Sequence, residues 1–153
     1  MATTSTPTAY ADDVFTWSKE QAAALRRMAV TRVNLPEPVD LLNLAEEIES
    51  LSISQLRELI SRYEVVLVHL LKCRYQPDKR TRSWGNTLMT QRAELERLLR
   101  LNPGLRTHRE EALQDAYRTA RRQAAYQTRL ALKMFPETCP FTVEEVESEE
   151  FWE

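Results

Sequence analysis

The stretch from residue 56 to residue 75 constrains the fold more than any other part of the chain. Apolar side chains recur there every three or four residues, at Leu59, Ile60, Tyr63, Val66, Leu67, Leu70 and Leu71. This spacing is typical of one face of a helix. Between residues 65 and 71 the run is apolar almost all round, so it leaves no polar face for water. We therefore expect the central helix of a bundle, ended by Pro77.

Two more helices are predicted before this segment. Asp12 or Asp13 can cap a first helix that runs to about Ala29, because a carboxylate accepts the free N–H groups of a first turn. The prolines of residues 35–38 interrupt the helical pattern, and a second helix begins near residue 39 or 40. Residues 52–54 either interrupt that second helix or lie within one long helix.

The C-terminal half predicts three further helices. Ser83 is the expected cap of a helix that ends near Leu101, and residues 102–104 interrupt the helical pattern again. The next helix runs to about Lys133 and carries alanines at every fourth position, Ala112, Ala116, Ala120 and Ala124. Thr142 and Glu145 have the spacing of a capping box, which predicts a last short helix.

These elements define the expected fold class. No strand alternation and no internal repeat are found, and 153 residues suit one domain. We expect an all-α, single-domain helical bundle of about five mostly antiparallel helices, with a short C-terminal helix and tail. The domain covers residues 10–153 and follows a disordered lead-in over residues 1–9.

Composition excludes several classes of protein. Gly85 and Gly104 are the only glycines, too few for a phosphate-cradling loop. Cys73 and Cys139 form no C-x-x-C pair and no disulfide framework. The N-terminus lacks a signal pattern. The most apolar run, residues 65–71, has seven residues including His69, where a membrane span needs about 20. We expect a cytoplasmic protein with no membrane partner and no cofactor.

Four blocks of residues, in order along the chain, carry a family resemblance. They are Tyr10-x-Asp12-Asp13-x-Phe15-x-Trp17; Asn43 to Leu51; His69 to Pro77 followed by Arg82-Ser83-Trp84; and Cys139-Pro140-Phe141-Thr142 followed by Phe151-Trp152. Together they resemble the bacterial family called domain of unknown function 29, which is abundant in cyanobacteria and proteobacteria. The resemblance implies a mostly helical fold and supplies no agreed activity, so it assigns no catalytic residues. The family usually has Gly where this chain has Ser52, which weakens the case for a helix break there.

Carboxylates and a histidine offer one candidate for metal chemistry. Glu46 and Glu49 share a helix face, and His69 is expected on the next helix, so the three together are a candidate metal site. No Glu-x-x-His motif supports it. The competing interpretation is that the glutamates are solvated or pair with arginines, and that His69 is buried, neutral and hydrogen-bonded to a Tyr, Ser or Glu side chain.

A basic segment is the second candidate. Cations and aromatic side chains alternate at Lys72, Arg74, Tyr75, Lys79, Arg80, Arg82 and Trp84. This combination suits a phosphate backbone and stacked bases, so the segment is a candidate nucleic-acid site. Six glutamates in the last ten residues offer an internal partner. We therefore also consider that the acidic tail docks on this segment, with Phe151 and Trp152 anchored in apolar pockets.

The sequence-based hypothesis for function is a non-enzymatic protein–protein interaction module. Its partner is another protein or a second copy of the chain, with the alanine stripe 112–124 as a dimer face. Nucleic-acid binding through residues 72–84 is the alternative, and a metal-dependent hydrolase is the weaker one. No catalytic residue is assigned, because the chain has no nucleophile elbow. The net charge of −2 gives no overall electrostatic bias toward nucleic acid or membrane.

Overall fold

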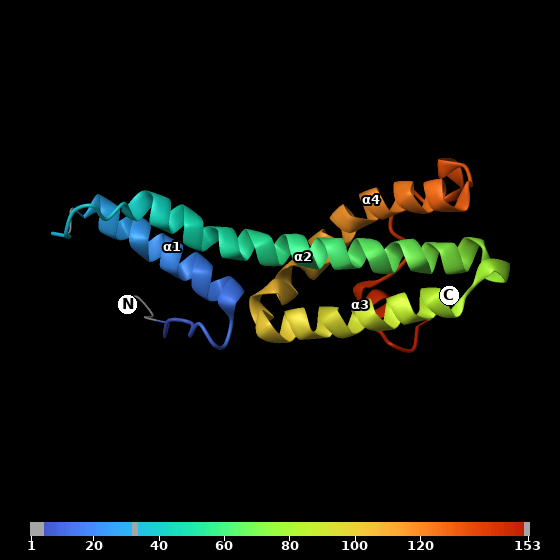
Figure 1. The fold of residues 1–153 in the computed structure, drawn as a ribbon, viewed down its shortest axis with the longest axis horizontal. Coiled ribbons are helices and arrows are strands. Elements are labelled where there is room, and N and C mark those ends of the chain that lie inside the picture. Colours follow the sequence, from blue (N-terminus) through green and yellow to red (C-terminus); the bar gives the residue numbers. More distant parts are fainter. Residues whose placement is uncertain (1–4, 32–33, 152–153) are drawn as a thin grey trace. The chain divides into compact units, whose positions relative to one another are not determined.

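The computed structural model describes residues 5–31 and 34–151. Within these residues the chain forms five α-helices and three short 3₁₀ helices, with no strand (Figure 1). The α-helices are α1 (Val14–Val30), α2 (Leu41–Tyr75), α3 (Arg82–Leu101), α4 (Arg109–Thr128) and α5 (Val143–Glu147), and the 3₁₀ helices are η1 (Pro77–Lys79), η2 (Pro103–His108) and η3 (Leu132–Met134). The all-α prediction is therefore confirmed.

Helix α2 is one uninterrupted helix of 35 residues. The serines near its middle do not act as caps for a second helix. Ser50 Oγ donates to the carbonyl of Glu47 at 2.6 Å, and Ser52 Oγ donates to the carbonyl of Glu49 at 2.7 Å. A hydroxyl that bonds back to the preceding turn is satisfied within the helix, so the long-helix alternative holds.

The chain divides into two compact units. The first comprises residues 1–56 and 99–106, and the second comprises residues 57–98 and 107–153. Helix α2 contributes residues to both. Residues 1–4 of the expected disordered lead-in lie outside the described residues, and both that lead-in and the single domain over residues 10–153 stay predictions. Across the described part of the chain, no helix combines the length and apolar character needed to cross a bilayer.

The first unit is a helical hairpin of α1 and the first half of α2 (Figure 1). Of the two predicted caps, Asp13 is the N-cap of α1 and accepts from the Thr16 backbone N–H at 3.0 Å. The Gly104 N–H donates to the other Asp13 carboxylate oxygen at 2.7 Å. Thr8 donates to Glu20 through both its backbone N–H and its hydroxyl. Side-chain and backbone hydrogen bonds therefore fix the start of α1.

The second unit holds most of the buried apolar side chains. The predicted central segment of α2 is fully buried at Leu59, Tyr63, Val66, Leu67, Leu70 and Leu71. Buried Arg92 of α3 donates to the carbonyls of Val146 and Glu145 at 2.9 and 3.0 Å. Tyr63 donates to Glu147 at 2.5 Å, and Arg109 pairs with the same carboxylate at 2.9 Å. These contacts hold α5 against three longer helices.

Two predicted helix ends were wrong, and hydrogen bonds explain both. Thr81, not Ser83, caps the first turn of α3, because its hydroxyl accepts from the Trp84 N–H at 3.3 Å. Helix α4 ends at Thr128 rather than near Lys133, since Arg129 adopts a left-handed conformation with φ 59° and ψ 22°. The predicted capping box is confirmed, with both reciprocal bonds between Thr142 and Glu145 present.

Candidate binding surfaces

The three metal-site candidates do not come together. Glu46, Glu49 and His69 all lie on α2, whereas the prediction placed His69 on a separate helix. Glu49 and His69 are twenty residues apart along this helix and belong to different units. Glu49 instead pairs with Arg26 at 2.6 Å, which lowers the pKa of the Glu49 carboxyl. Among the described residues, no group of three His, Cys, Asp or Glu side chains could hold a metal ion.

His69 has a structural environment. Its Nδ1 lies 2.8 Å from the carbonyl oxygen of Val65, so the ring donates to the preceding turn of its own helix. Burial lowers the pKa of the imidazole, as expected for a neutral histidine. The expected side-chain partner was wrong, because the backbone carbonyl supplies the hydrogen bond.

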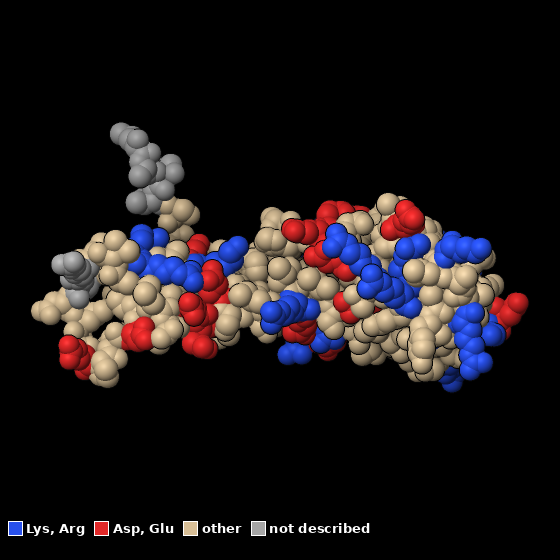
Figure 2. Space-filling model, turned by 90° about the horizontal axis from the view of Figure 1, so that it is seen from above, with Lys and Arg blue, Asp and Glu red and all other residues tan. Residues whose placement is uncertain are grey.

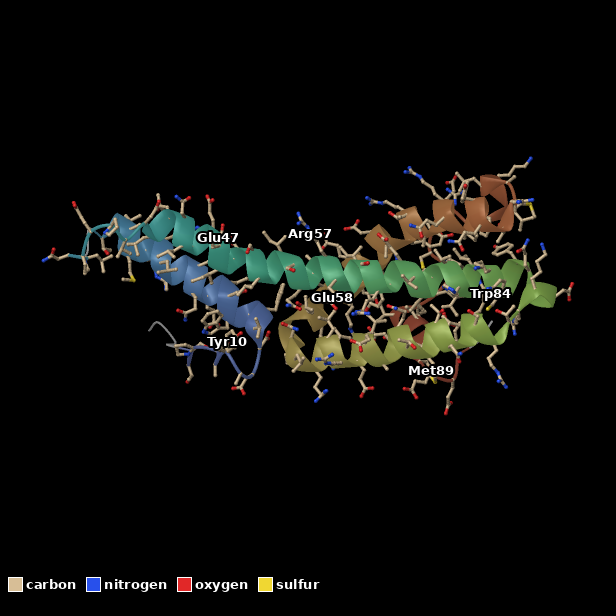
Figure 3. The ribbon with its side chains drawn as sticks, in the orientation of Figure 1. Tyr10, Glu47, Arg57, Glu58, Trp84 and Met89 are labelled. Atoms are coloured by element: carbon tan, nitrogen blue, oxygen red, sulfur yellow. The ribbon has the colours of Figure 1, made fainter. Side chains whose placement is uncertain are left out.

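The aromatic members of the predicted nucleic-acid site contact other side chains of the same unit. The Lys72 Nζ lies 4.4 Å from the ring centre of Trp84, at the C-terminal end of α2 (Figure 3). The ring centre of Tyr75 lies 4.7 Å from that of Phe135. Both Tyr75 and Trp84 are half-buried. Stacking of bases on these two rings would therefore require the existing contacts to be displaced.

The cations of the same segment divide into two groups. The Arg74 guanidinium lies over the ring of Phe141, 4.4 Å from its centre. Lys79, Arg80 and Arg82 are exposed, although Arg80 Nη2 also reaches the Cys73 carbonyl at 3.5 Å. The exposed group runs from the last residue of η1 to the first residue of α3, and we call this segment, residues 79–82, the loop. This loop is the part of the predicted site that the structure leaves open.

The acidic tail approaches one member of the basic segment through aromatic rings. Phe151 lies 6.0 Å from Phe141, ring centre to ring centre, and Phe141 is the ring that Arg74 covers. The ion pair of Glu147 runs to Arg109, outside residues 72–84. Trp152, the second predicted anchor, lies outside the described residues. The contacts with Phe141 therefore involve the tail's Phe151 and the segment's Arg74.

The C-terminal end of α4 adds a basic surface that sequence reasoning missed. Lys72 Nζ donates to Gln127 Oε1 at 3.1 Å, and Gln76 Nε2 donates to the Thr128 carbonyl at 3.0 Å. These bonds place the end of α4 beside the end of α2. We call the exposed cations Lys79, Arg80, Arg82, Arg122, Arg129 and Lys133 the basic end. Figure 2 shows Lys and Arg gathered at this end of the second unit, on the right.

A sequence signal for this surface exists. The twenty-one residues from 116 to 136 contain five arginines and lysines and no aspartate or glutamate. The stretch includes Tyr126, whose side chain is 87% exposed. The local pattern did not show which of these cations face water, because that depends on the packing of α4 against its neighbours.

The hairpin of the first unit has two different flanks. Fully buried Ala22 and Ala45 face inward from α1 and α2, and the Arg26–Glu49 ion pair bridges the two helices. At 3.6 residues per turn, that ion pair lies on one flank of the hairpin. Leu42 and Ile53 belong to the same flank of α2.

The opposite flank is apolar. We call its residues the hairpin face: Leu44, Ile48 and Leu51 of α2 with Leu25 and Met28 of α1. Leu44 and Leu51 are 45% and 39% exposed, and the other three are half-buried. Glu47 projects from the first half of α2 (Figure 3). Leu42 and Ile53 are also exposed, at 59% and 46%, on the ion-paired flank. The hairpin face differs in gathering apolar side chains from both helices, so it can pack against another helix.

The fold and these surfaces define an all-α protein with two candidate binding surfaces. The family model described as "Domain of unknown function DUF29" matches residues 9–152, so the chain belongs to this family. It is also similar to an alpha-helical protein of unknown function from Rhodospirillum rubrum ATCC 11170, known from a crystal structure. That similarity has a TM-score of 0.75 and 26% sequence identity, and covers 94% of this chain and 92% of the other. A search of curated proteins gave no match.

Proposed function

We propose that this protein is a non-enzymatic protein–protein interaction module and that the hairpin face is its binding surface. The observation that carries the proposal is the pair Leu44 and Leu51, seven residues apart and both exposed, with Ile48 between them. Clustered apolar side chains at helical spacing are typical of surfaces that receive a partner helix. Burying them would stabilise a complex by about 25 cal/mol for each Å² of apolar area removed from water.

The alanine stripe does not serve as the dimer face. Ala112, Ala116, Ala120 and Ala124 are at most 1% exposed within the second unit. Their small side chains allow close packing inside the chain itself, so a second copy has no access to them. The homodimer prediction therefore needs another surface.

A second copy of the chain is the partner that the hairpin face fits most directly. Leu41, Leu44, Ile48, Leu51 and Gln55 repeat at alternating intervals of three and four residues. This is the heptad spacing of a two-helix seam. An antiparallel pair would bring Ile48 of each copy against Leu51 of the other, which is a self-complementary contact of the kind that two-fold dimers use.

The oligomeric state tests this proposal. Sedimentation equilibrium over a wide concentration range is expected to show a monomer–dimer equilibrium. The double substitution Leu44→Glu and Leu51→Glu should weaken the dimer at least about 100-fold, because it would bury unpaired carboxylates. The matched control is Leu42→Glu and Ile53→Glu, on the opposite flank of the same helix, and should leave the dimer intact. A monomer at every concentration, or equal losses in both variants, would contradict the proposed dimer.

Nucleic-acid binding is a second candidate function, and one observation favours it. Lys79, Arg80 and Arg82 are all exposed between the end of η1 and the first residue of α3. Neutralising phosphates with such side chains provides affinity that does not depend on base sequence. The test is anisotropy of labelled RNA with wild-type protein and with Lys79, Arg80 and Arg82 replaced by Gln. Binding that survives the triple substitution unchanged would argue against this loop as the site.

A further inference from the structure

We infer that the basic end as a whole binds single-stranded nucleic acid, with Tyr126 as the platform on which an unpaired base stacks. This inference rests on the second candidate function and extends its site from the loop to α4. The phosphate backbone would lie across the loop cations 79–82 and the cations of α4 and η3.

Two hydrogen bonds make the loop and the end of α4 parts of one surface. The bond from Lys72 to Gln127 is 3.1 Å long, and the bond from Gln76 to the Thr128 carbonyl is 3.0 Å long. Gln76 directly precedes η1, and Gln127 directly follows Tyr126. The exposed cations of both segments therefore lie at the same end of the second unit (Figure 2).

The charge of this surface is not neutralised by carboxylates. None of the six cations of the basic end forms an ion pair within the described residues. Arg121, their neighbour on α4, donates instead to the carbonyls of Phe135 and Leu132. Asp78 is the acidic residue within the loop. A concentration of unpaired cations of this kind favours a ligand with closely spaced negative charges.

Tyr126 favours unpaired bases over a duplex. Its ring is 87% exposed and borders a shallow hollow of about 530 Å³, lined also by Ala125, Gln127, Arg129 and Leu130. Aromatic rings bind the faces of single-stranded bases, whereas a duplex keeps those faces within its stack. Tyr126 thus supplies the exposed ring that the half-buried Tyr75 and Trp84 do not.

The backbone at Arg129 gives an independent indication of a role for this residue. Arg129 has φ 59° and ψ 22° at the position that ends α4. Helices usually place glycine in this left-handed conformation, because a side chain makes it strained. The Arg129 N–H reaches the Tyr126 carbonyl at 3.4 Å, so the turn holds the two residues close together. An arginine in a strained position beside an exposed ring is placed to contact a phosphate.

The experiment is fluorescence anisotropy of a labelled oligouridine across a salt series. Six phosphate contacts predict a log–log slope near about −4, from roughly −0.7 per contact. Replacing Arg122, Arg129 and Lys133 by Gln should bring the slope to about −2. Tyr126→Ala should weaken binding about tenfold, and Tyr126→Phe should restore most of it. The charge-matched control, with Arg27, Arg57 and Arg97 replaced by Gln on three other helices, should leave the slope unchanged.

The outcomes separate this inference from the function on which it rests. The inference would be overturned if replacing Lys79, Arg80 and Arg82 abolished binding while replacing Arg122, Arg129 and Lys133 left it unchanged. The loop would then remain the site. No oligouridine binding by the wild-type protein at low salt would overturn both. Tighter binding of duplex DNA, or binding to vesicles rich in phosphatidylserine without any to oligouridine, would also overturn it. Should the α4 triple variant fail to fold, Arg129→Gly keeps the test available, because glycine suits that backbone conformation.

Discussion

At the residue scale, the same side-chain type has different roles in different surroundings. Arg92 is 3% exposed and binds two backbone carbonyls at the end of α5, and burial lowers the pKa of its guanidinium. Arg74 covers an aromatic ring, whereas Arg82 and Arg129 face water. The identity of a cation therefore does not indicate its role until its neighbours are known.

Arg129 yields a prediction about stability. Arg129→Gly relieves the left-handed strain, worth about 1 kcal/mol, although added chain flexibility in the unfolded state offsets part of the gain. We expect the melting temperature to rise by about 2 °C, measured by circular dichroism. Arg129→Ala is the control, because it removes the same charge but keeps the strained Cβ, and it should show no gain. Equal melting temperatures for both variants would contradict the strain argument.

His69 yields a prediction about pH. Its pKa is lowered in the folded chain, whereas an unfolded histidine titrates near about 6.5. Below that pH the unfolded state binds more protons, so the free energy of unfolding should fall as the pH drops through this range. His69→Gln should reduce that fall. Urea unfolding at about pH 7.5 and about pH 5.5 measures it, and an identical pH dependence in both proteins would show that His69 does not contribute.

At the element scale, the first turn of α1 depends on a distant residue. Asp13 caps this turn through Thr16 and also accepts from the N–H of Gly104, in η2, at 2.7 Å. A Cβ at Gly104 would meet the Thr16 hydroxyl and would lie 2.9 Å from the Asp13 carboxylate. The absence of a side chain at Gly104 thus allows η2 to pack against the cap of α1.

Gly104→Ala should therefore destabilise the protein through α1. We expect a loss of about 1–3 kcal/mol in the free energy of unfolding, the usual cost of forcing atoms into a packed site. Denaturant unfolding followed by circular dichroism measures it. The same substitution in a Thr16→Ala background should cost less, because one of the contacted atoms is gone. Additive losses in the double variant would show that the contact with Thr16 is not the cause.

At the scale of the whole molecule, the two units differ in how much apolar surface each buries. The buried apolar residues of the first unit are Phe15, Ala22, Ala45, Leu99 and Leu105, two of which are alanines. The second unit buries the central face of α2 together with leucines of α3 and α4. Local opening requires less free energy where fewer apolar contacts are lost.

We therefore predict faster backbone hydrogen exchange in α1 and residues 41–56 than in residues 59–71. Mass spectrometry of exchanged peptides measures this difference. At high protein concentration, the protection of residues 41–56 should rise if the hairpin face pairs with a second copy, since association stabilises the folded form. Uniform exchange along α2 at every concentration would contradict both expectations.

The sequence by itself determined the all-α class, the segments that form helices, an aspartate cap at residue 12 or 13 and the Thr142–Glu145 capping box. These features depend on apolar spacing and on hydrogen bonds between residues close in the chain, so local patterns predict them. The loop cations 79–82 were likewise identified from the sequence as a candidate site. The Thr81 cap and the end of α4 were missed, because neighbouring residues offered nearly equivalent alternatives.

Only the tertiary structure decided which side chains remain available. The alanine stripe became core, Tyr75 and Trp84 became half-buried, and Tyr126 remained exposed beside Arg129. The separation of Glu49 from His69 followed from α2 continuing through Ser52. Exposure depends on which elements distant in the sequence pack together, and that packing reflects the burial of the whole apolar surface rather than any local pattern.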